Sequence, residues 1–165
     1  MRIAIKLIAL LLLPATMVGQ SIINLKNQAV IMSNAMVNGD YKTFLEHQYP
    51  KVIEMEGGKQ KMLQELIESD KQMKLLSVSF IDVKIGQPDK FYQAGNEIHA
   101  LLPQTISANT SSGRSTFPGN LLAVSQDSGK TWTFIRLTKS AITKIPKLFP
   151  NFNNELKIPE PTSRI

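Results

Sequence analysis

The chain has 165 residues, of which 42% are hydrophobic and 19% are charged, and its formal net charge is +6. This length suffices for one folded domain with a sizeable core and is too short for two domains of ordinary size. The sequence contains no cysteine, which excludes disulfide bonds and acylation at a cysteine. The domain must therefore be held together by its hydrophobic core.

Residues 1–20 have the pattern of a secretory signal peptide. A basic start, MRIAIK, precedes the apolar run LIALLLLPATMV, and small or polar residues follow. The run is too short for a transmembrane helix, which needs about 20 apolar residues. We therefore expect cleavage near Gly19 or Gln20, a secreted or periplasmic protein, and no transmembrane anchor.

The helical pattern occupies the first half of the remaining chain. Apolar residues recur from Leu25 to Met36 at intervals of three and four, which predicts an amphipathic helix that ends at Asn38-Gly39. Asp40 is placed to cap a second, short helix, and Pro50 restricts where that helix can end. A third short piece leads into Gly57-Gly58.

The longest predicted helix runs from about residue 59 to about residue 76. Its polar side chains lie on one face, and we expect the other face to pack against a sheet as the centre of the core. The residues of that apolar face are Met62, Leu63, Leu66, Ile67 and Met73.

Beyond residue 76 the hydrophobic period changes from that of helices to that of strands. Strands are predicted at residues 77–86, 97–108, 117–126 and 130–138. The alternation in the first of them shifts phase near Phe80, which predicts a β-bulge or burial on both faces. The end, residues 141–165, is rich in proline, and we expect at most one helical turn near residues 140–145 followed by a strap or tail. Residues 21–140 are thus predicted to form a single α+β domain.

The segment SQDSGKTWTF fits the sialidase-type Asp-box, S-x-D-x-G-x-T-W, at each specified position. The motif predicts a hairpin turn in which Asp127 accepts backbone N–H groups and Gly129 takes a positive φ. Sialidase-like propellers repeat this motif from blade to blade, whereas one copy in about 145 residues cannot build a propeller. We therefore interpret Ser125, Asp127, Gly129, Thr131 and Trp132 as a structural turn and not as a sugar site.

The order of elements resembles the nuclear transport factor two-like superfamily, which includes the SnoaL-like proteins. The segment AMVNGDYKTFLEHQYPKVIEMEGGKQKM carries the resemblance, together with the strands that follow it. The resemblance implies N-terminal helices and a curved, cone-like antiparallel sheet of about four strands with a pocket at its wide end. Members of such folds include enzymes and binding modules, so the fold does not select the function.

In catalytic members of that superfamily an Asp, His or Tyr constellation lies deep in the pocket. The candidates in this sequence are His47, His99, Asp82 and Tyr41. His47 falls off the apolar face of its helix, and the concave face of the strand that carries His99 is not evident from sequence. For His47, His99 and Asp82, a structural or solvent-facing role is the interpretation that we favour.

Other chemistries lack the residues they need. The two histidines lie 52 positions apart, and no zinc, calcium, phosphate-loop or dinucleotide fingerprint occurs, so we expect neither a metal nor a cofactor. The basic residues of positions 114–165, eight against three acidic ones, are scattered without interleaved aromatic residues, so no nucleic-acid partner is expected. This basic third leaves an envelope-associated structural protein open.

We expect an exported binding or accessory domain, without enzymatic activity, for a small apolar ligand or a protein partner. The alternative is an isomerase- or dehydratase-like enzyme that uses His47 or His99 together with Tyr41 or Asp82. The two differ in their cavities, since an enzyme needs ionisable side chains that converge within hydrogen-bond reach of one cavity.

Overall fold

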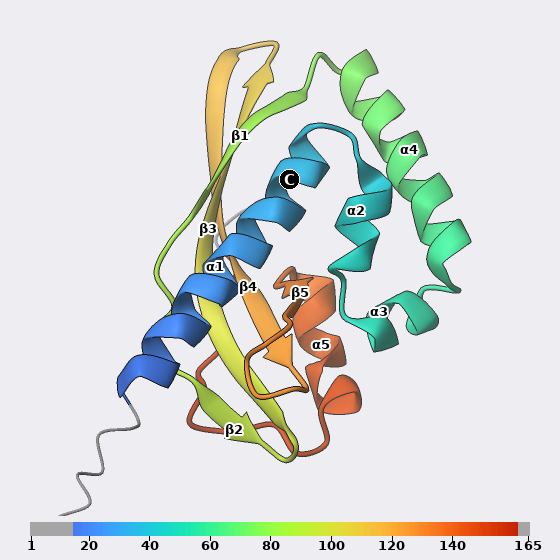
Figure 1. The fold of residues 1–165 in the computed structure, drawn as a ribbon. Coiled ribbons are helices and arrows are strands. Elements are labelled where there is room, and N and C mark those ends of the chain that lie inside the picture. Colours follow the sequence, from blue (N-terminus) through green and yellow to red (C-terminus); the bar gives the residue numbers. More distant parts are fainter. Residues whose placement is uncertain (1–14, 162–165) are drawn as a thin grey trace, which may run out of the picture.

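The structure, a computed structural model, describes residues 15–161, with side chains from residue 21 onward. It confirms the predicted α+β class: helices come first and an open antiparallel sheet follows (Figure 1). The helices are α1 (Ala15–Val37), α2 (Tyr41–Glu46), α3 (Pro50–Met55), α4 (Lys59–Leu75) and α5 (Lys139–Leu148). The strands are β1 (Ser79–Ile85), β2 (Tyr92–Ala94), β3 (Glu97–Thr110), β4 (Gly113–Ser125) and β5 (Thr133–Arg136).

Strand β3 organises the sheet. It pairs with β4 along its whole length, and β5 extends the sheet on the far side of β4. On its other edge β3 pairs with both β2 and β1, β2 near its start and β1 near its end. The register of β1 shifts between Phe80 and Asp82, so the bulge predicted near Phe80 is confirmed.

The helix boundaries follow from local signals in the sequence. Gly39 adopts φ +73° after the last turn of α1, and the Asp40 carboxylate then accepts a hydrogen bond from the Thr43 amide at 3.2 Å as the N-cap of α2. Pro50 opens α3 at its first position, where the missing N–H would have no intrahelical acceptor. Residues 47–49 connect α2 to α3 and form backbone hydrogen bonds with β5.

Helix α1 covers one face of the sheet, which we call the α1 face (Figure 1). Its buried residues Leu25, Ala29 and Met32 pack with side chains from β3, β4 and β5. The sheet residues of this cluster are Ala100, Leu102, Leu121, Ala123 and Phe134, with Trp132 beside them. Burial of this apolar stripe is what holds α1 in place.

The expectation that the longest amphipathic segment of residues 59–76 packs on the sheet is wrong. Helix α4 packs against α2 and α3, at the side of the molecule away from the sheet (Figure 1). None of its residues is buried, and Ile67 is 40% exposed. The amphipathic pattern correctly indicated an apolar face. That face packs on α2 and α3 because α1, and not α4, covers the sheet.

The opposite side of the sheet, which we call the α5 face, has its own core. Leu122 and Val124 of β4 and Ile135 of β5 meet α5 and the chain that follows it. From that C-terminal part, Ile145, Leu148, Phe149 and Leu156 are buried, together with Tyr49 and Tyr92. The prediction of at most one helical turn was therefore too short, because α5 has ten residues despite containing Pro146.

The turn between β4 and β5 is held by side-chain hydrogen bonds. The Asp127 carboxylate accepts from the amides of Lys130 (3.1 Å) and Thr131 (2.8 Å), and Gly129 adopts φ +86°. The indole of Trp132 is buried and donates to the Gly129 carbonyl at 3.1 Å. Strand β5 begins at Thr133, three residues after the predicted start at residue 130.

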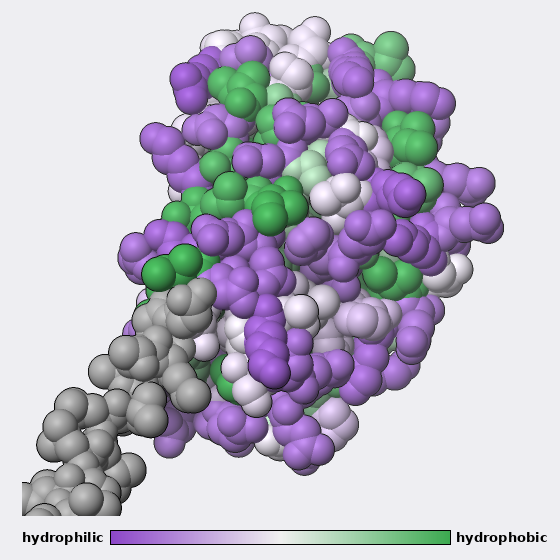
Figure 2. Space-filling view, in the orientation of Figure 1, coloured by the Kyte–Doolittle hydropathy of each residue, from purple (hydrophilic) through white to green (hydrophobic). Residues whose placement is uncertain are grey.

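Within residues 15–161, no helix combines the length and hydropathy that a membrane span requires. Figure 2 shows a mostly hydrophilic face interrupted by separate hydrophobic patches. The predicted signal peptide falls largely outside the described residues, and only its last six positions are described, as the start of the α1 backbone.

Candidate functional site

The four candidate residues lie in different surroundings. Tyr41 is buried at the start of α2, where burial and then the Asp70 carboxylate raise the pKa of its hydroxyl. His47 is partly exposed at the end of α2, with Nδ1 3.0 Å from the Thr43 carbonyl. Among the described residues, no hydrogen bond or ring contact joins any two of the candidates.

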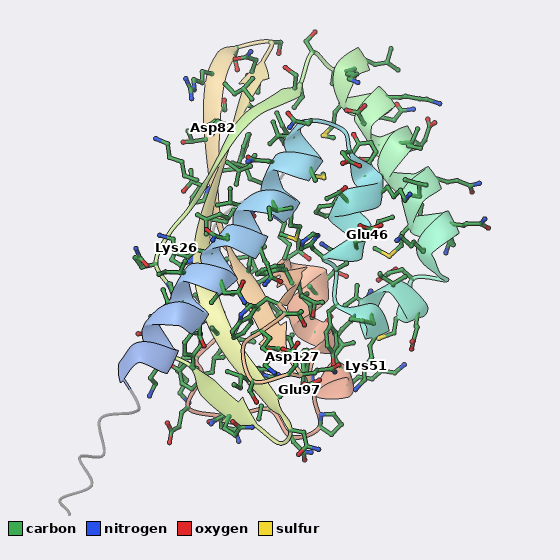
Figure 3. All side chains as sticks on the ribbon, in the orientation of Figure 1. Lys26, Glu46, Lys51, Asp82, Glu97 and Asp127 are labelled. Carbon is green, nitrogen blue, oxygen red and sulfur yellow. The ribbon has the colours of Figure 1, made fainter. Side chains whose placement is uncertain are left out.

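Asp82 and His99 are too far apart to share a site. Asp82 is paired with Ser107, eight residues along β3 from His99, which corresponds to about 27 Å at about 3.4 Å per residue. Figure 3 shows Asp82 toward one end of the sheet and Glu97, two residues before His99, toward the other. The constellation that the family resemblance implies is therefore not assembled from these four residues.

A cavity of about 70 Å³ lies on the α1 face, where α1, α2 and four strands converge. We call it the α1-face cavity. Its walls are mainly apolar, and the apolar lining residues are Met32, Met36, Phe44, Val83, Ile106 and Leu121. Four polar side chains, Ser33, Gln48, Gln104 and Arg136, complete it. Its outline thus combines an apolar body with a few polar groups, the usual character of a small-molecule site.

Two of these polar side chains already have hydrogen-bond acceptors in the protein. The Gln104 amide donates to the Ser33 hydroxyl at 3.1 Å, and the Gln48 amide donates to the Met32 sulfur at 3.4 Å. Arg136 differs from them, because within residues 21–161 its guanidinium has no hydrogen bond, no ion pair and no ring contact. Burial lowers the pKa of Arg136 below its ordinary value.

The strand alternation explains why Arg136 faces this cavity. Phe134 and Arg136 are two residues apart on β5 and therefore point to the same face, and Phe134 packs in the α1-face cluster. Ile135 and Leu137 point to the opposite side and join the α5-face core. The sequence analysis did not single out Arg136, although the pattern F-x-R in a strand was the signal for a cation on a core-facing surface.

A polar network lies on the α5 face, around Glu97. The Glu97 carboxylate accepts from the Tyr49 hydroxyl at 2.9 Å and the Gln126 amide at 2.7 Å, and lies 3.1 Å from His99 Nε2. Burial would raise the pKa of Glu97, but the hydrogen bonds from Gln126, His99 and Tyr49 together lower it. Glu97 is therefore a carboxylate that is held by three neighbours.

His99 is the most deeply buried member of this network. Its side chain is 1% exposed, and its ring lies 4.7 Å from that of Phe149 and 5.6 Å from that of Phe152. Burial lowers the pKa of His99, and Glu97 opposes this only in part. Nδ1 has no hydrogen-bond partner among the described residues and is shielded from solvent.

A second cavity of about 200 Å³ adjoins this network. We call it the α5-face cavity. Glu97 and His99 lie in its wall with Lys51, Asn96 and the end of α5. Figure 3 shows Glu97 and Lys51 at the same end of the molecule. Sequence analysis found His99 but missed Glu97; the E-x-H spacing within a strand was the available signal, since residues two apart share a face.

Comparisons with known protein families, with curated proteins and with solved structures find no match. In residues 15–161, no group of three His, Cys, Asp or Glu side chains is arranged to hold a metal ion. The function must therefore be argued from the two cavities themselves.

Proposed function

We propose that this chain is a non-enzymatic binding domain and that its ligand is a small, largely apolar molecule held in the α1-face cavity. The observation that carries the proposal is the lining of this cavity, in which six apolar side chains from α1, α2 and the sheet surround a space of about 70 Å³. Burial of apolar ligand surface against such walls is the dominant favourable contribution to binding.

The same lining argues against acid–base catalysis at this cavity. None of its residues is an Asp, Glu, His, Lys or Tyr, so no side chain there exchanges a proton near neutral pH. Met32 and Met36 are flexible, polarisable side chains, which suits them to adjust to a ligand of variable shape.

Differential scanning fluorimetry with small apolar compounds such as benzene and 1-butanol tests this proposal. We expect at least one compound to raise the melting temperature of the full chain in a saturable way. Val83→Phe, which places a larger side chain in the cavity wall, should abolish the shift. The matched control Val30→Phe, at a residue of α1 that is 40% exposed, should keep it.

If Val83→Phe retains the shift, the compound binds elsewhere and the proposal fails. If no compound in a broad panel shifts the melting temperature, the cavity is a packing defect and not a binding site. Calorimetric titration of the best compound into both variants separates these outcomes from a simple change in stability.

The second candidate function is general-base catalysis by His99 at the α5-face cavity. The contact between Glu97 and His99 Nε2 favours it, because a carboxylate at one ring nitrogen orients the imidazole and leaves the other as a base. However, Nδ1 is shielded from solvent, and Phe149 and Phe152 pack against the ring. A substrate could reach Nδ1 only after these residues moved, and for this reason we favour binding at the α1 face.

This alternative predicts turnover that His99→Gln abolishes while the melting temperature is retained. Gln at this position can still donate a hydrogen bond to Glu97, so the fold is kept and only the basic nitrogen is lost. Loss of activity with an unchanged fold would replace the binding proposal with the enzymatic one.

We further propose that the domain is exported and that it is similar in fold to the nuclear transport factor two-like superfamily. The basic and apolar pattern of residues 1–20 supports export. Helices that precede a mostly antiparallel sheet, with the first helix laid across one face, support the similarity. N-terminal sequencing of the protein from its native source tests export, and an intact Met1 on the isolated protein would contradict it.

A further inference from the structure

Among the residues that the structure describes, Arg136 is the only charged side chain in the wall of the α1-face cavity. A guanidinium carries five N–H donors and does not lose its proton under ordinary conditions. Within residues 21–161, none of these donors has an acceptor in the protein. Because Arg136 is only half-buried, these donors can contact solvent or a ligand in the cavity that Arg136 lines.

Arg136 is half-buried, and a cation that loses part of its hydration without gaining a counter-ion is destabilised. Lys144, which is likewise half-buried, has such a counter-ion in the carboxylate of Glu56. Arg136, which lines the cavity together with six apolar side chains, has none among the residues that the structure describes.

An anion with a planar pair of oxygens would supply the counter-ion that Arg136 lacks among the described residues. A carboxylate matches the guanidinium in a bidentate arrangement, and such charge-assisted pairs are among the strongest hydrogen bonds in proteins. The apolar remainder of the cavity requires that the rest of the molecule be hydrocarbon. A compact, multiply charged anion such as phosphate would leave most of its oxygens facing apolar walls.

The volume limits the size of the occupant. A water molecule occupies about 10–15 Å³ of such a cavity, so about 70 Å³ holds roughly five water molecules. This is room for a molecule of roughly five or six non-hydrogen atoms, which is the size of propionate or butyrate. Phe44, Ile106 and Leu121 would contact the hydrocarbon tail.

We propose that the α1-face cavity is a site for a short-chain monocarboxylate whose carboxylate pairs with Arg136 and whose tail packs on the apolar walls. This inference rests on the proposed binding function and specifies the class of its ligand.

The test is calorimetric titration of the full chain with three probes: butyrate, its uncharged analogue butyramide, and inorganic phosphate. We expect butyrate to bind at least tenfold more tightly than butyramide, and phosphate to bind more weakly than butyrate. Arg136→Met should bring butyrate and butyramide to equal affinity. The matched control Arg114→Met, at an exposed arginine of β4, should preserve the preference for butyrate.

Each outcome bears on one of the two proposals. Binding of butyramide and butyrate with equal affinity to the unmodified protein would overturn the assignment to a carboxylate and leave the apolar site intact. Phosphate that binds as tightly as butyrate would overturn the role of the hydrocarbon tail. If neither butyrate nor the neutral compounds bind, both the inference and the binding function fail.

A third variant, Arg136→Lys, tests the proposal even if Arg136→Met does not fold. Arg136→Lys keeps the positive charge but loses the bidentate geometry, so it should fold and bind butyrate more weakly than the unmodified protein, with a reduced preference over butyramide. An unchanged preference in Arg136→Lys together with an unchanged preference in Arg136→Met would show that the charge at this position does not select the ligand.

Discussion

Substitution of Asp127 by alanine removes the acceptor that organises the turn between β4 and β5. The carboxylate accepts four hydrogen bonds: from the Ser125 hydroxyl at 2.9 Å, from the amides of Lys130 (3.1 Å) and Thr131 (2.8 Å), and from the Thr131 hydroxyl at 2.7 Å. Burial would raise the pKa of Asp127, but these bonds together lower it. The hydrogen bonds of the folded turn therefore favour the ionised form of the Asp127 side chain.

The magnitude follows from the number of bonds and their exposure. A hydrogen bond contributes about 0.5–1.5 kcal/mol net, and the donors at Lys130 and Thr131 are exposed, so that water can replace the lost acceptor. The lower limit therefore applies, which gives about 2 kcal/mol for the four bonds. For a domain of this size that loss corresponds to a fall in melting temperature of about 4–8 °C.

Thermal and urea unfolding, followed by circular dichroism at neutral pH, measure this loss. Asp127→Asn is the matched variant, since it keeps one oxygen for the two amides and removes the charge; we expect about half the loss. The stabilisation requires the ionised carboxylate and has a depressed folded-state pKa. It is thus complete above the ordinary pKa of 3.8 and is lost as pH falls through the folded-state value.

An unchanged melting temperature in Asp127→Ala would refute this reasoning, because it would show that the turn is specified by the adjoining strands alone. Equal losses in Asp127→Ala and Asp127→Asn would show that the charge, and not the acceptor geometry, is what matters.

Three further predictions concern packing, protonation and backbone conformation. Leu25→Ala, at a fully buried residue of α1, should lower the free energy of unfolding by about 2–5 kcal/mol. Leu66→Ala, on α4, should lower it by only about 1 kcal/mol because no residue of α4 is buried. Equal losses of the two variants in urea unfolding would contradict the placement of the two helices. The depressed pKa of His99, caused mainly by burial, means that the unfolded chain binds a proton first as pH falls below the ordinary value of 6.5, so stability should decrease from there toward the folded-state value. His99→Gln should remove this pH dependence and His47→Gln should keep it; the reverse result would assign the dependence to the other histidine. Gly129→Ala should destabilise the fold by about 1–3 kcal/mol, because φ at this position is +86° and the added methyl group would lie 2.9 Å from the hydroxyl oxygen of Ser21 in α1. A melting temperature within about 1 °C of that of the unmodified protein would contradict this prediction.

The amino-acid sequence by itself determined the features that depend on neighbours along the chain. Gly39 and Asp40 end one helix and begin the next because a positive φ and an N-cap carboxylate act within a few residues. The phase shift near Phe80 marks a bulge for the same local reason. These signals sufficed for the α+β class and for the ends of α1 and α4, but they did not predict β2 or the start of β4 at Gly113.

The tertiary structure decided which apolar faces meet. The sequence predicts two amphipathic helices, α1 and α4, either of which could pack on the sheet. Hydrophobic periodicity indicates that a helix has an apolar face but does not indicate which element covers it. The α1 helix takes the sheet and α4 packs on α2 and α3, so the predicted core residues Leu66 and Ile67 lie outside the core.

The candidate site depended on the same long-range choices. Alternation along β5 places Arg136 on the face of Phe134, but only the fold shows that this face is the one beneath α1 and that a cavity remains there. Likewise, the sequence places Glu97 and His99 on one face of β3, while Tyr49 and Phe149 reach them from segments about fifty residues away in either direction. Such contacts join residues distant along the chain, and no local pattern encodes them.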